Sequence, residues 1–420
     1  MRLEPNQAPS VTDDAPARTF GDALSTAASS GVDASVVLLS IAVVIAMISL
    51  VMTVRNLARY RPATPASRGG SVAVCIPARN ESRNLRACVE SAIGSAGAGE
   101  GGAAIDLEVL VYDDGSTDGT GSILATLVAE DARVRAVETV PLPEGWNGKQ
   151  HGCDRMGRAA TKEWLLFTDA DVRFEPQSLE SVVATAEAKG VDLLSTFPRQ
   201  EMGSFGERLF IPMIGFILFS YLPMGRMQRT LDPAASAGCG QYLFVRREAW
   251  LACGGHAAFR DSMHDGIRLP RLLRRHGRRT DLFDGTSIVS CRMYEGFGAC
   301  WRGFAKNAFE GLGSIGLLVF VTILHLIGHV MPWVFLLGAA LVPSWRSPWA
   351  IGLAIAAIAT ALLQRSLLAS RLRQPIASVL WHPLAILLSI AVQWRSWWLH
   401  VTGRRSWRGR TAGEAGLAAT

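Results

Sequence analysis

The stretch Trp164-Leu165-Leu166-Phe167-Thr168-Asp169-Ala170-Asp171 joins an apolar run to two carboxylates separated by one small residue. Such a run is typical of a strand buried in a parallel sheet, and open α/β sheets bind ligands at the carboxyl ends of such strands. Because residues i and i+2 of a strand point the same way, we expect Asp169 and Asp171 to share a hard divalent cation. Such a cation could hold a diphosphate as a bond breaks. An isolated Asp-x-Asp is usually a solvated loop, so its companions decide the interpretation.

Three earlier apolar runs indicate the same kind of sheet. Residues 71–76 and 107–112 are each followed by a polar turn and a helix-like segment, and residues 134–140 continue the alternation. Alternating strands and helices are typical of a Rossmann-like, mostly parallel sheet. The fold class predicted for residues 70–312 is therefore α/β.

The composition indicates a membrane protein. Of the 420 residues, 49% are hydrophobic and 19% are charged, and the mean hydropathy is +0.22. The net charge is +6, and the excess arginines lie beside long apolar runs, which favours membrane orientation over nucleic-acid binding. The seven cysteines form no Cys-x-x-Cys pair, so we expect reduced thiols in a cytosolic compartment.

The N-terminal part predicts a membrane anchor followed by a cytoplasmic domain. Residues 1–33 are rich in Ala, Ser and Asp and are expected to be a disordered arm. Residues 34–54 are apolar and long enough for one transmembrane helix. Arginines follow at positions 55, 59, 61 and 68, with no acid before Glu81. The positive-inside rule therefore places the domain at residues 70–312 in the cytoplasm.

The C-terminal part predicts a helical membrane region in which one segment does not span. Residues 313–394 contain three apolar segments, at 315–342, 349–363 and 376–392, and residues 395–420 form a basic tail. Three full spans after a cytoplasmic domain would leave this tail outside, against the charge rule. Because the last two segments are short or marginal, we expect one of the three to be re-entrant or interfacial. The predicted location is the cell (inner) membrane, with several passes.

A shorter apolar stretch, residues 209–224, lies inside the predicted cytoplasmic domain and is broken by prolines. This pattern predicts an interfacial or re-entrant helix on the membrane surface. The alternative is a buried core helix.

Polar turns follow the first two predicted strands. The first is Ile76-Pro77-Ala78-Arg79-Asn80-Glu81, whose polar groups could meet the base and ribose of a nucleotide or merely cap a helix. The second is Asp113-Asp114-Gly115-Ser116-Thr117-Asp118, where carboxylates can accept hydrogen bonds from a ribose hydroxyl or a base N–H. Its alternative is an Asp-capped turn.

Three later motifs add groups for phosphate binding and proton transfer. In Gly148-Lys149, the glycine lets the backbone approach a ligand, and the lysine offers a charge for phosphate. Asp265, in Met263-His264-Asp265, is a candidate general base for a nucleophilic hydroxyl. Arg302 and Lys306 are spaced i, i+4, so on a helix they could clamp a diphosphate, and a basic membrane-proximal anchor explains them equally well.

In this order the motifs resemble the membrane-bound glycosyltransferase family 2, which has a GT-A fold. The resemblance covers about residues 70–310 and rests on the motifs at 77–81, 113–116, 148–149 and 169–171 and on Asp265. The Gly-Trp-Asn-Gly-Lys run at 145–149 and the Arg-Gly-Phe-Ala-Lys run at 302–306 are most similar to one branch. That branch holds the hopene-associated and the carotenoid-acid glycosyltransferases.

The resemblance implies an inverting glycosyltransferase that uses a UDP-sugar with Mg²⁺ or Mn²⁺. It implies that Asp171, with Asp169, holds the metal and that Asp265 is the base. The candidate donor-binding residues are Pro77, Arg79, Glu81, Asp113, Asp114, Lys149, Asp169, Arg302 and Lys306. The predicted reaction moves a single sugar to a membrane lipid, such as a hopanoid, a carotenoid or another lipid.

Two departures from the family bear on this prediction. His264 stands where the family usually has an acid before the base, and the Gln-x-x-Arg-Trp motif of processive polysaccharide synthases is absent from the sequence. The missing motif argues for single-sugar transfer. The alternatives are a polysaccharide synthase, a transferase to polyprenyl phosphate, and a non-catalytic membrane scaffold that only binds nucleotide.

Overall fold

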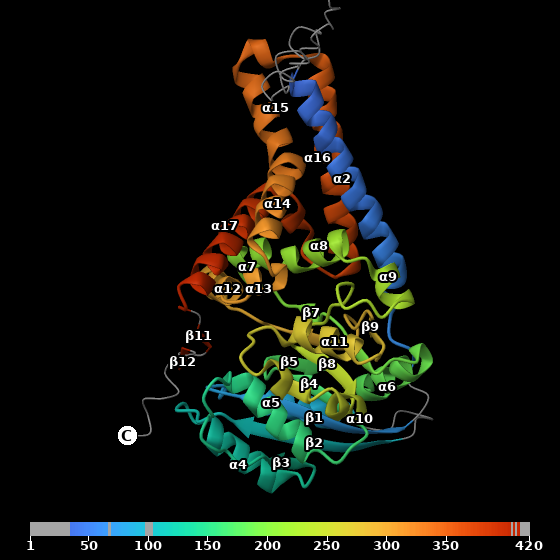
Figure 1. Cartoon of the computed structure of the whole chain (residues 1–420), viewed down its shortest axis with the longest axis vertical. Coiled ribbons are helices and arrows are strands. Elements are labelled where there is room, and N and C mark those ends of the chain that lie inside the picture. The colour runs from blue at the N-terminus through green and yellow to red at the C-terminus, as the bar shows by residue number, and fades with distance from the viewer. Residues whose placement is uncertain (1–33, 66–68, 97–103, 405, 408–409, 412–420) are drawn as a thin grey trace, which may run out of the picture.

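The computed structural model describes residues 34–65, 69–96, 104–404, 406–407 and 410–411. An α/β domain lies at one end, a stalk of long helices at the other, and short helices between them (Figure 1). The predicted disordered arm, residues 1–33, and most of the predicted tail beyond residue 404 lie outside the described residues.

The α/β domain is built on a seven-stranded sheet with the order β3-β2-β1-β4-β8-β6-β9. β1 pairs in parallel with β2 and β4, and β2 with β3, whereas β8 runs antiparallel to β4 and β6. The predicted α/β class with a mostly parallel sheet is therefore confirmed. The strands are β1 Gly70–Ala78, β2 Ile105–Asp113, β3 Val134–Ala136, β4 Trp164–Thr168, β6 Leu193–Ser195, β8 Tyr242–Arg246 and β9 Thr280–Leu282.

Helices cover both faces of this sheet because strand residues alternate between two cores. Val72, Val74 and Ile76 of β1 pack in one core, with α3 Leu85–Gly94, α4 Thr120–Glu130 and α6 Ser178–Lys189. Ala73 and Cys75 pack in the other core. The helices on that side are α5 Gly148–Ala159, α10 Arg247–Ala252, the 3₁₀ turn Gly255–Phe259 and α11 Asp265–Arg275.

A second sheet, with the order β5-β10-β7, lies beside the end of β4. β5 Val172–Phe174 begins directly after Asp171, and it pairs with β10 Val289–Cys291, with Cys291 opposite Val172. β7 Arg199–Gln200 pairs with the other side of β10. Asp169-Ala170-Asp171 is thus the turn between β4 and β5. The expectation that Asp169 and Asp171 lie on a strand was wrong, because β4 ends at Thr168.

Short helices connect the domain to the stalk, namely α7 Phe205–Phe210, α8 Pro212–Tyr221, α9 Met224–Arg229, α12 Gly296–Ala305 and α13 Ala308–Leu312 (Figure 1). α8 buries Phe216 and Phe219 in a cluster with Tyr60, Leu368 and Ile386. α8 therefore packs one face into the core, as the alternative interpretation held, and the position of residues 209–224 at the membrane surface stays a prediction.

Three helices of the stalk are long and apolar enough to cross a membrane. They are α2 Ala34–Arg59, the continuous helix from α14 Ile315–His325 through the π-helical turn Leu326–Val330 to α15 Met331–Leu341, and α16 Pro348–Arg371. The predicted segment 349–363 is shorter than α16, which continues past the buried Arg365. The segment 376–392 forms instead a 3₁₀ turn, Ile376–Val379, and the first half of α17 His382–Val401, which lies at the base of the stalk (Figure 1). Residues 395–401 of the predicted tail are therefore helical.

A buried amide joins the stalk to the helix below it. Gln364 Nε2 of α16 lies 2.8 Å from Ser49 Oγ and from Thr53 Oγ1 of α2, and 2.7 Å from Ser220 Oγ of α8. In an apolar bundle, hydroxyls of this kind have few other partners.

We expect Gln364→Ala to destabilise the protein by about 1–2 kcal/mol, because it leaves three buried hydroxyls without this partner. The measurement is the thermal unfolding midpoint of the full chain in lipid nanodiscs. Thr360→Val is the control, because the exposed Thr360 hydroxyl bonds mainly to Ala356 O of its own helix. Equal midpoints for the two variants would show that the amide does not hold the helices together.

Candidate active site

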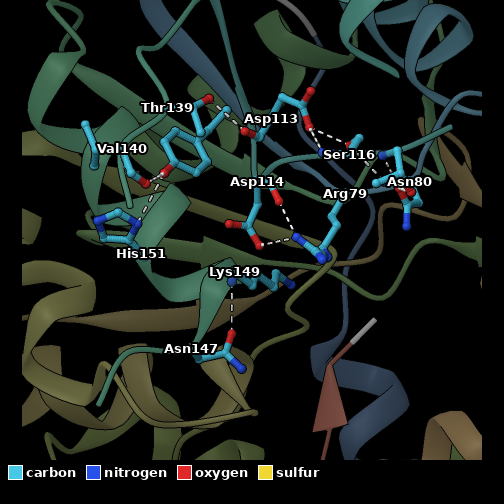
Figure 2. A network of polar contacts seen from close by, with 12 residues as sticks. Arg79, Asn80, Asp113, Asp114, Ser116, Thr139, Val140, Asn147, Lys149 and His151 are labelled. Atoms are coloured by element: carbon cyan, nitrogen blue, oxygen red, sulfur yellow. Dashed lines mark hydrogen bonds and ion pairs between the residues drawn. The ribbon is translucent and has the colours of Figure 1, made fainter. Parts of the chain in front are cut away.

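Hydrogen bonds join the turn after β1 to the turn after β2 (Figure 2). Arg79 Nη1 donates to the carbonyl of Asp114 and lies 3.4 Å from Asp114 Oδ2. Asn80 donates its N–H to Ser116 Oγ at 2.9 Å, and Ser116 donates its N–H to Asp113 Oδ1 at 3.0 Å. Asp113 therefore caps its own turn, as the alternative interpretation held. Asp114 is buried, and the turns form a rigid edge at the carboxyl ends of the two strands.

Glu81 and Asp171 face a cavity of about 510 Å³, which lies between the β1–α3 turn, the β4–β5 turn and β10. Arg173, Cys291 and Arg292 are among its other lining residues. Glu81 accepts a hydrogen bond from Asn84 Nδ2 at 3.1 Å, and its N–H donates to Thr120 Oγ1 at 2.9 Å. The volume is within the range of ligand sites, and the lining carries both signs of charge.

Lys149 stands at the start of α5, where the side chain of Asn147 accepts a hydrogen bond from its N–H at 3.0 Å (Figure 2). Its ammonium lies 2.7 Å from Asp169 Oδ1, 2.9 Å from Asp265 Oδ2 and 3.3 Å from the carbonyl oxygen of Gly240. We call this contact the lysine bridge. Burial alone would lower the pKa of Lys149, but Asp169 and Asp265 outweigh it and hold that pKa well above its usual value.

Asp265 is the first residue of α11 and is only 5% exposed. Burial opposes its ionisation, but the charge and hydrogen bond of Lys149 outweigh that effect and lower its pKa. Gly240 packs against it so closely that a Cβ there would lie 2.1 Å from Asp265 Oδ1. The Gly240 backbone thus closes directly on the candidate base and fixes its carboxylate.

The Asp-x-Asp turn has room for a cation. Asp171 Oδ1 is buried and has no hydrogen-bond partner among the described residues. Burial and the charge of Asp169 raise the pKa of Asp171 to about 7. Two carboxylates that repel each other, one with an orphaned oxygen, fit a hard divalent cation. Over the described ranges, no group of three or more His, Cys, Asp or Glu could hold a metal by itself, so further oxygens would come from a ligand.

Glu310 is a carboxylate near the site that the motifs did not indicate. From α13, it accepts hydrogen bonds from Ser262 Oγ, Met263 N and Arg268 Nε, at 2.5, 3.2 and 3.2 Å. Glu310 therefore fixes the loop that precedes His264 and Asp265, although it is distant from that loop in the sequence. No sequence signal could have indicated it, because Glu310 lies in an apolar, membrane-proximal stretch and is in contact with the loop only in the folded chain.

The remaining predicted residues lie apart from the lysine bridge. Pro77 is inside β1, paired with Tyr112 in the sheet. Arg302 is exposed on α12 and, within the described part of the chain, forms no ion pair with Asp169 or Asp171. Lys306 is the C-cap of the same helix. The structure thus gathers Lys149, Asp169 and Asp265, and the diphosphate clamp of Arg302 and Lys306 stays a prediction.

The chain is similar in sequence to a known protein family and to known proteins. Residues 73–251 match the family described as Glycosyl transferase family 2. The 4,4'-diaponeurosporenoate glycosyltransferase of Staphylococcus haemolyticus (strain JCSC1435) is 25% identical over 252 residues, which cover 58% of this chain and 62% of that protein. The Succinoglycan biosynthesis protein ExoA of Rhizobium meliloti (strain 1021) is 28% identical over 260 residues, which cover 58% of this chain and 72% of that protein.

One solved structure supports the fold. The mannosyltransferase PcManGT from Pyrobaculum calidifontis, in complex with GDP-Man and Mn²⁺, has a TM-score of 0.51 at 19% identity, covering 86% of this chain and 99% of that chain. The match to the Staphylococcus haemolyticus protein spans less than two thirds of that protein's length. The family match covers residues 73–251, and the likeness to the solved structure confirms the predicted GT-A fold class.

We expect Lys149→Met to destabilise the protein by about 2 kcal/mol or more, because it leaves the buried Asp265 without its partner charge. Adding Asp265→Asn should recover much of this loss. Thermal midpoints of the two single variants and the double variant measure the coupling. Lys162→Met is the control, because its partner Asp106 is 68% exposed. Additive effects at Lys149 and Asp265 would contradict the lysine bridge.

We expect Gly240→Ala to destabilise the protein by about 1–3 kcal/mol, because the added methyl group must displace the Asp265 carboxylate. The thermal unfolding midpoint of the full chain measures this loss of stability. Gly94→Ala is the matched control, since a Cβ at Gly94 would meet nothing within 4 Å. A midpoint for Gly240→Ala as high as that of the control would mean that the carboxylate is free to move aside.

Proposed function

We propose, from the premise that residues 73–251 are a glycosyl transferase family 2 domain, that the chain transfers one sugar from a nucleotide sugar to a membrane lipid. The observation that carries the proposal is the lysine bridge, which places an ionised carboxylate, Asp265, across from the Asp-x-Asp turn. A base on one side and a diphosphate site on the other are what a direct displacement at a sugar carbon needs.

The donor is proposed to be a UDP-sugar held at the turns after β1 and β2. The uridine would meet Glu81, Arg79 and Asp113 or Asp114, which form the rigid edge described above. Its diphosphate would extend toward Asp171. A solved relative of the same fold contains GDP-Man, so a guanosine donor belongs in the same test.

The proposed metal is Mg²⁺ or Mn²⁺, held by Asp171 with Asp169. The orphaned oxygen of Asp171 supports this assignment, and the solved relative contains Mn²⁺. A cation bound there supplies charge stabilisation for the leaving diphosphate. Lys149 already lies against Asp169, so its ammonium adds a second positive charge on the same side.

In the proposed reaction, Asp265 accepts the proton of the acceptor hydroxyl. The acceptor oxygen then forms a bond to the anomeric carbon, while the bond from that carbon to the diphosphate oxygen breaks and the diphosphate leaves with the electron pair. With one carboxylate base and one displacement, the configuration at the anomeric carbon inverts. If the acceptor is a lipid carboxylate, no proton has to be removed and Asp265 only orients the attacking oxygen.

The membrane orientation that we propose uses three spans. α2 crosses the membrane toward the cytoplasm, the α14–α15 helix crosses back to the outer side, and α16 crosses to the cytoplasm again. α17 then lies along the membrane interface. The α/β domain and Arg395 of α17 then both face the cytoplasm, which agrees with the positive-inside rule. In this orientation the conflict in the predicted topology disappears, because α17 is not among the described helices that are long and apolar enough to cross a membrane.

The acceptor is proposed to enter where the α/β domain meets the stalk. Aromatic side chains gather there: the exposed Phe205 and Trp381 are in edge-to-face contact at 5.2 Å, and the exposed Phe297 stacks on the partly buried Trp301 at 6.3 Å. Such rings are typical of the membrane interface. The relative named as a diaponeurosporenoate glycosyltransferase agrees with an apolar acceptor. The relative named for succinoglycan biosynthesis makes a polymer the second candidate product.

The test follows nucleotide release by membranes containing the full chain, with a panel of UDP-sugars and GDP-mannose, bacterial lipid extract, and added Mg²⁺ or Mn²⁺. Mass spectrometry identifies the lipid that gains one sugar. A polymer in the product would favour the synthase, sugar on a lipid phosphate would favour a polyprenyl-phosphate acceptor, and donor binding without turnover would favour a scaffold.

We expect Asp265→Asn to lower transfer by about 100-fold or more while donor affinity stays within about threefold, because proton removal is lost while the turns proposed to hold the nucleotide and Asp171 are unchanged. Asp171→Asn should instead weaken metal-dependent donor binding. Calorimetry measures binding, and nucleotide release measures transfer. Asp261→Asn is the control, as an exposed acid in the same loop. Transfer at the normal rate by Asp265→Asn would remove it as the base.

A further inference from the structure

A second cavity, of about 670 Å³, lies at the foot of α2. Its walls come from the last turn of α2, from α9, from the end of α6 and from the segment that leads into β9, the edge strand of the main sheet. Figure 1 shows α9 beside the lower end of α2, where the stalk meets the α/β domain. No residue lines both this cavity and the one beside Asp171.

The lining of this cavity is strongly basic. Asp281 is the only acid among the described residues of the lining, and it is already paired with Lys189 Nζ at 2.6 Å. Among the described residues, none of the five arginines of the lining forms an ion pair with a carboxylate. The basic lining residues are Arg59, Arg61, Lys189, Arg229, Arg274 and Arg279.

Arg274 forms the floor of the cavity and is 3% exposed. Its guanidinium donates to Thr280 Oγ1 and to the carbonyl oxygens of Met227, Thr230 and Thr280, all at 2.7 Å. All these partners are neutral, so the charge itself is not balanced there. Burial lowers the pKa of Arg274, the charges of Asp281 and Asp232 oppose this effect, and repulsion by Arg279 adds a smaller lowering. An anion in the cavity would relieve this repulsion.

The level of the cavity relative to the membrane indicates the source of the anion. Arg59 is the last residue of α2, a helix of 26 residues that is long enough to span, so in the proposed orientation the cavity opens at the level of lipid headgroups. Val191, Met227 and Leu231 add an apolar side to the lining, and Leu231 is 42% exposed. Basic pockets at this level suit phosphate headgroups.

We propose that this cavity binds a phosphate group, and that its source is the headgroup of an anionic phospholipid. Guanidinium groups bind phosphate oxygens through paired hydrogen bonds, and several can converge on one phosphate here. The bound headgroup would fix the α/β domain against the membrane surface. The inference uses the proposed membrane orientation and does not depend on the transfer reaction.

The experiment measures binding by the full chain in detergent. Calorimetry measures the affinity of three probes: dioctanoyl phosphatidylglycerol, dioctanoyl phosphatidylcholine and inorganic phosphate. The test variant is Arg229→Gln with Arg279→Gln, both exposed at the rim of the cavity, and Arg61→Gln is a second variant from another segment. The matched control is Arg395→Gln with Arg404→Gln, which also removes two positive charges close to the proposed membrane surface. Both of these arginines lie over the ring of Trp398 and do not line the cavity.

We expect phosphatidylglycerol to bind the wild type, and the Arg229/Arg279 variant to bind it about tenfold more weakly or worse, with the control within about twofold. Inorganic phosphate that binds as tightly as phosphatidylglycerol and competes with it would assign the site to a soluble phosphate instead. Equal weakening in test and control variants, tight binding of phosphatidylcholine, or no binding of either phosphate probe would overturn the proposal. Unchanged thermal midpoints without ligand show that the variants are folded.

Discussion

The Lys149 ammonium is the contact on which the site depends, because it joins three segments that are far apart in the sequence. The cap of α5 by Asn147 fixes its backbone, and its charge lies between Asp169 at the end of β4 and Asp265 at the start of α11. Without a cation between them, the two carboxylates would repel each other, which would favour protonation of one of them. The same charge keeps Asp265 ionised although that side chain is buried.

The architecture explains why this site lies near a membrane. Parallel strands β1, β2 and β4 end at one edge of the sheet and bring the turns with Arg79, Asp113 and Asp169 together. The chain after β7 then leaves the sheet to build α7, α8 and α9 under the stalk before it returns as β8. Glu310, from the helix that precedes the stalk, bonds to the loop before Asp265. The candidate base is therefore held by the sheet on one side and by the membrane-proximal helices on the other.

Local patterns in the sequence predicted what depends on local physics. The apolar runs predicted the four parallel strands, and the polar turns after them predicted the site edge, because parallel strands end on the same side. Contacts between distant segments could not be predicted in this way. Examples are the partners of Lys149, the bonds of Glu310, and the burial of Phe216 that makes α8 a core helix. The predicted apolar segment 349–363 stops short of Arg365, yet Arg365 is buried inside α16. The two- and three-residue strands around Asp171 are too short to show any periodicity.

The central claim is that Asp265 alone serves as the base for one direct displacement. The most direct test is the anomeric configuration of the sugar in the lipid product, compared with that in the donor, from the proton coupling constant at the anomeric position. A single displacement predicts that an α-linked donor gives a β-linked product. A product with the donor's own configuration would contradict the account, because retention needs a second step that a single base does not provide.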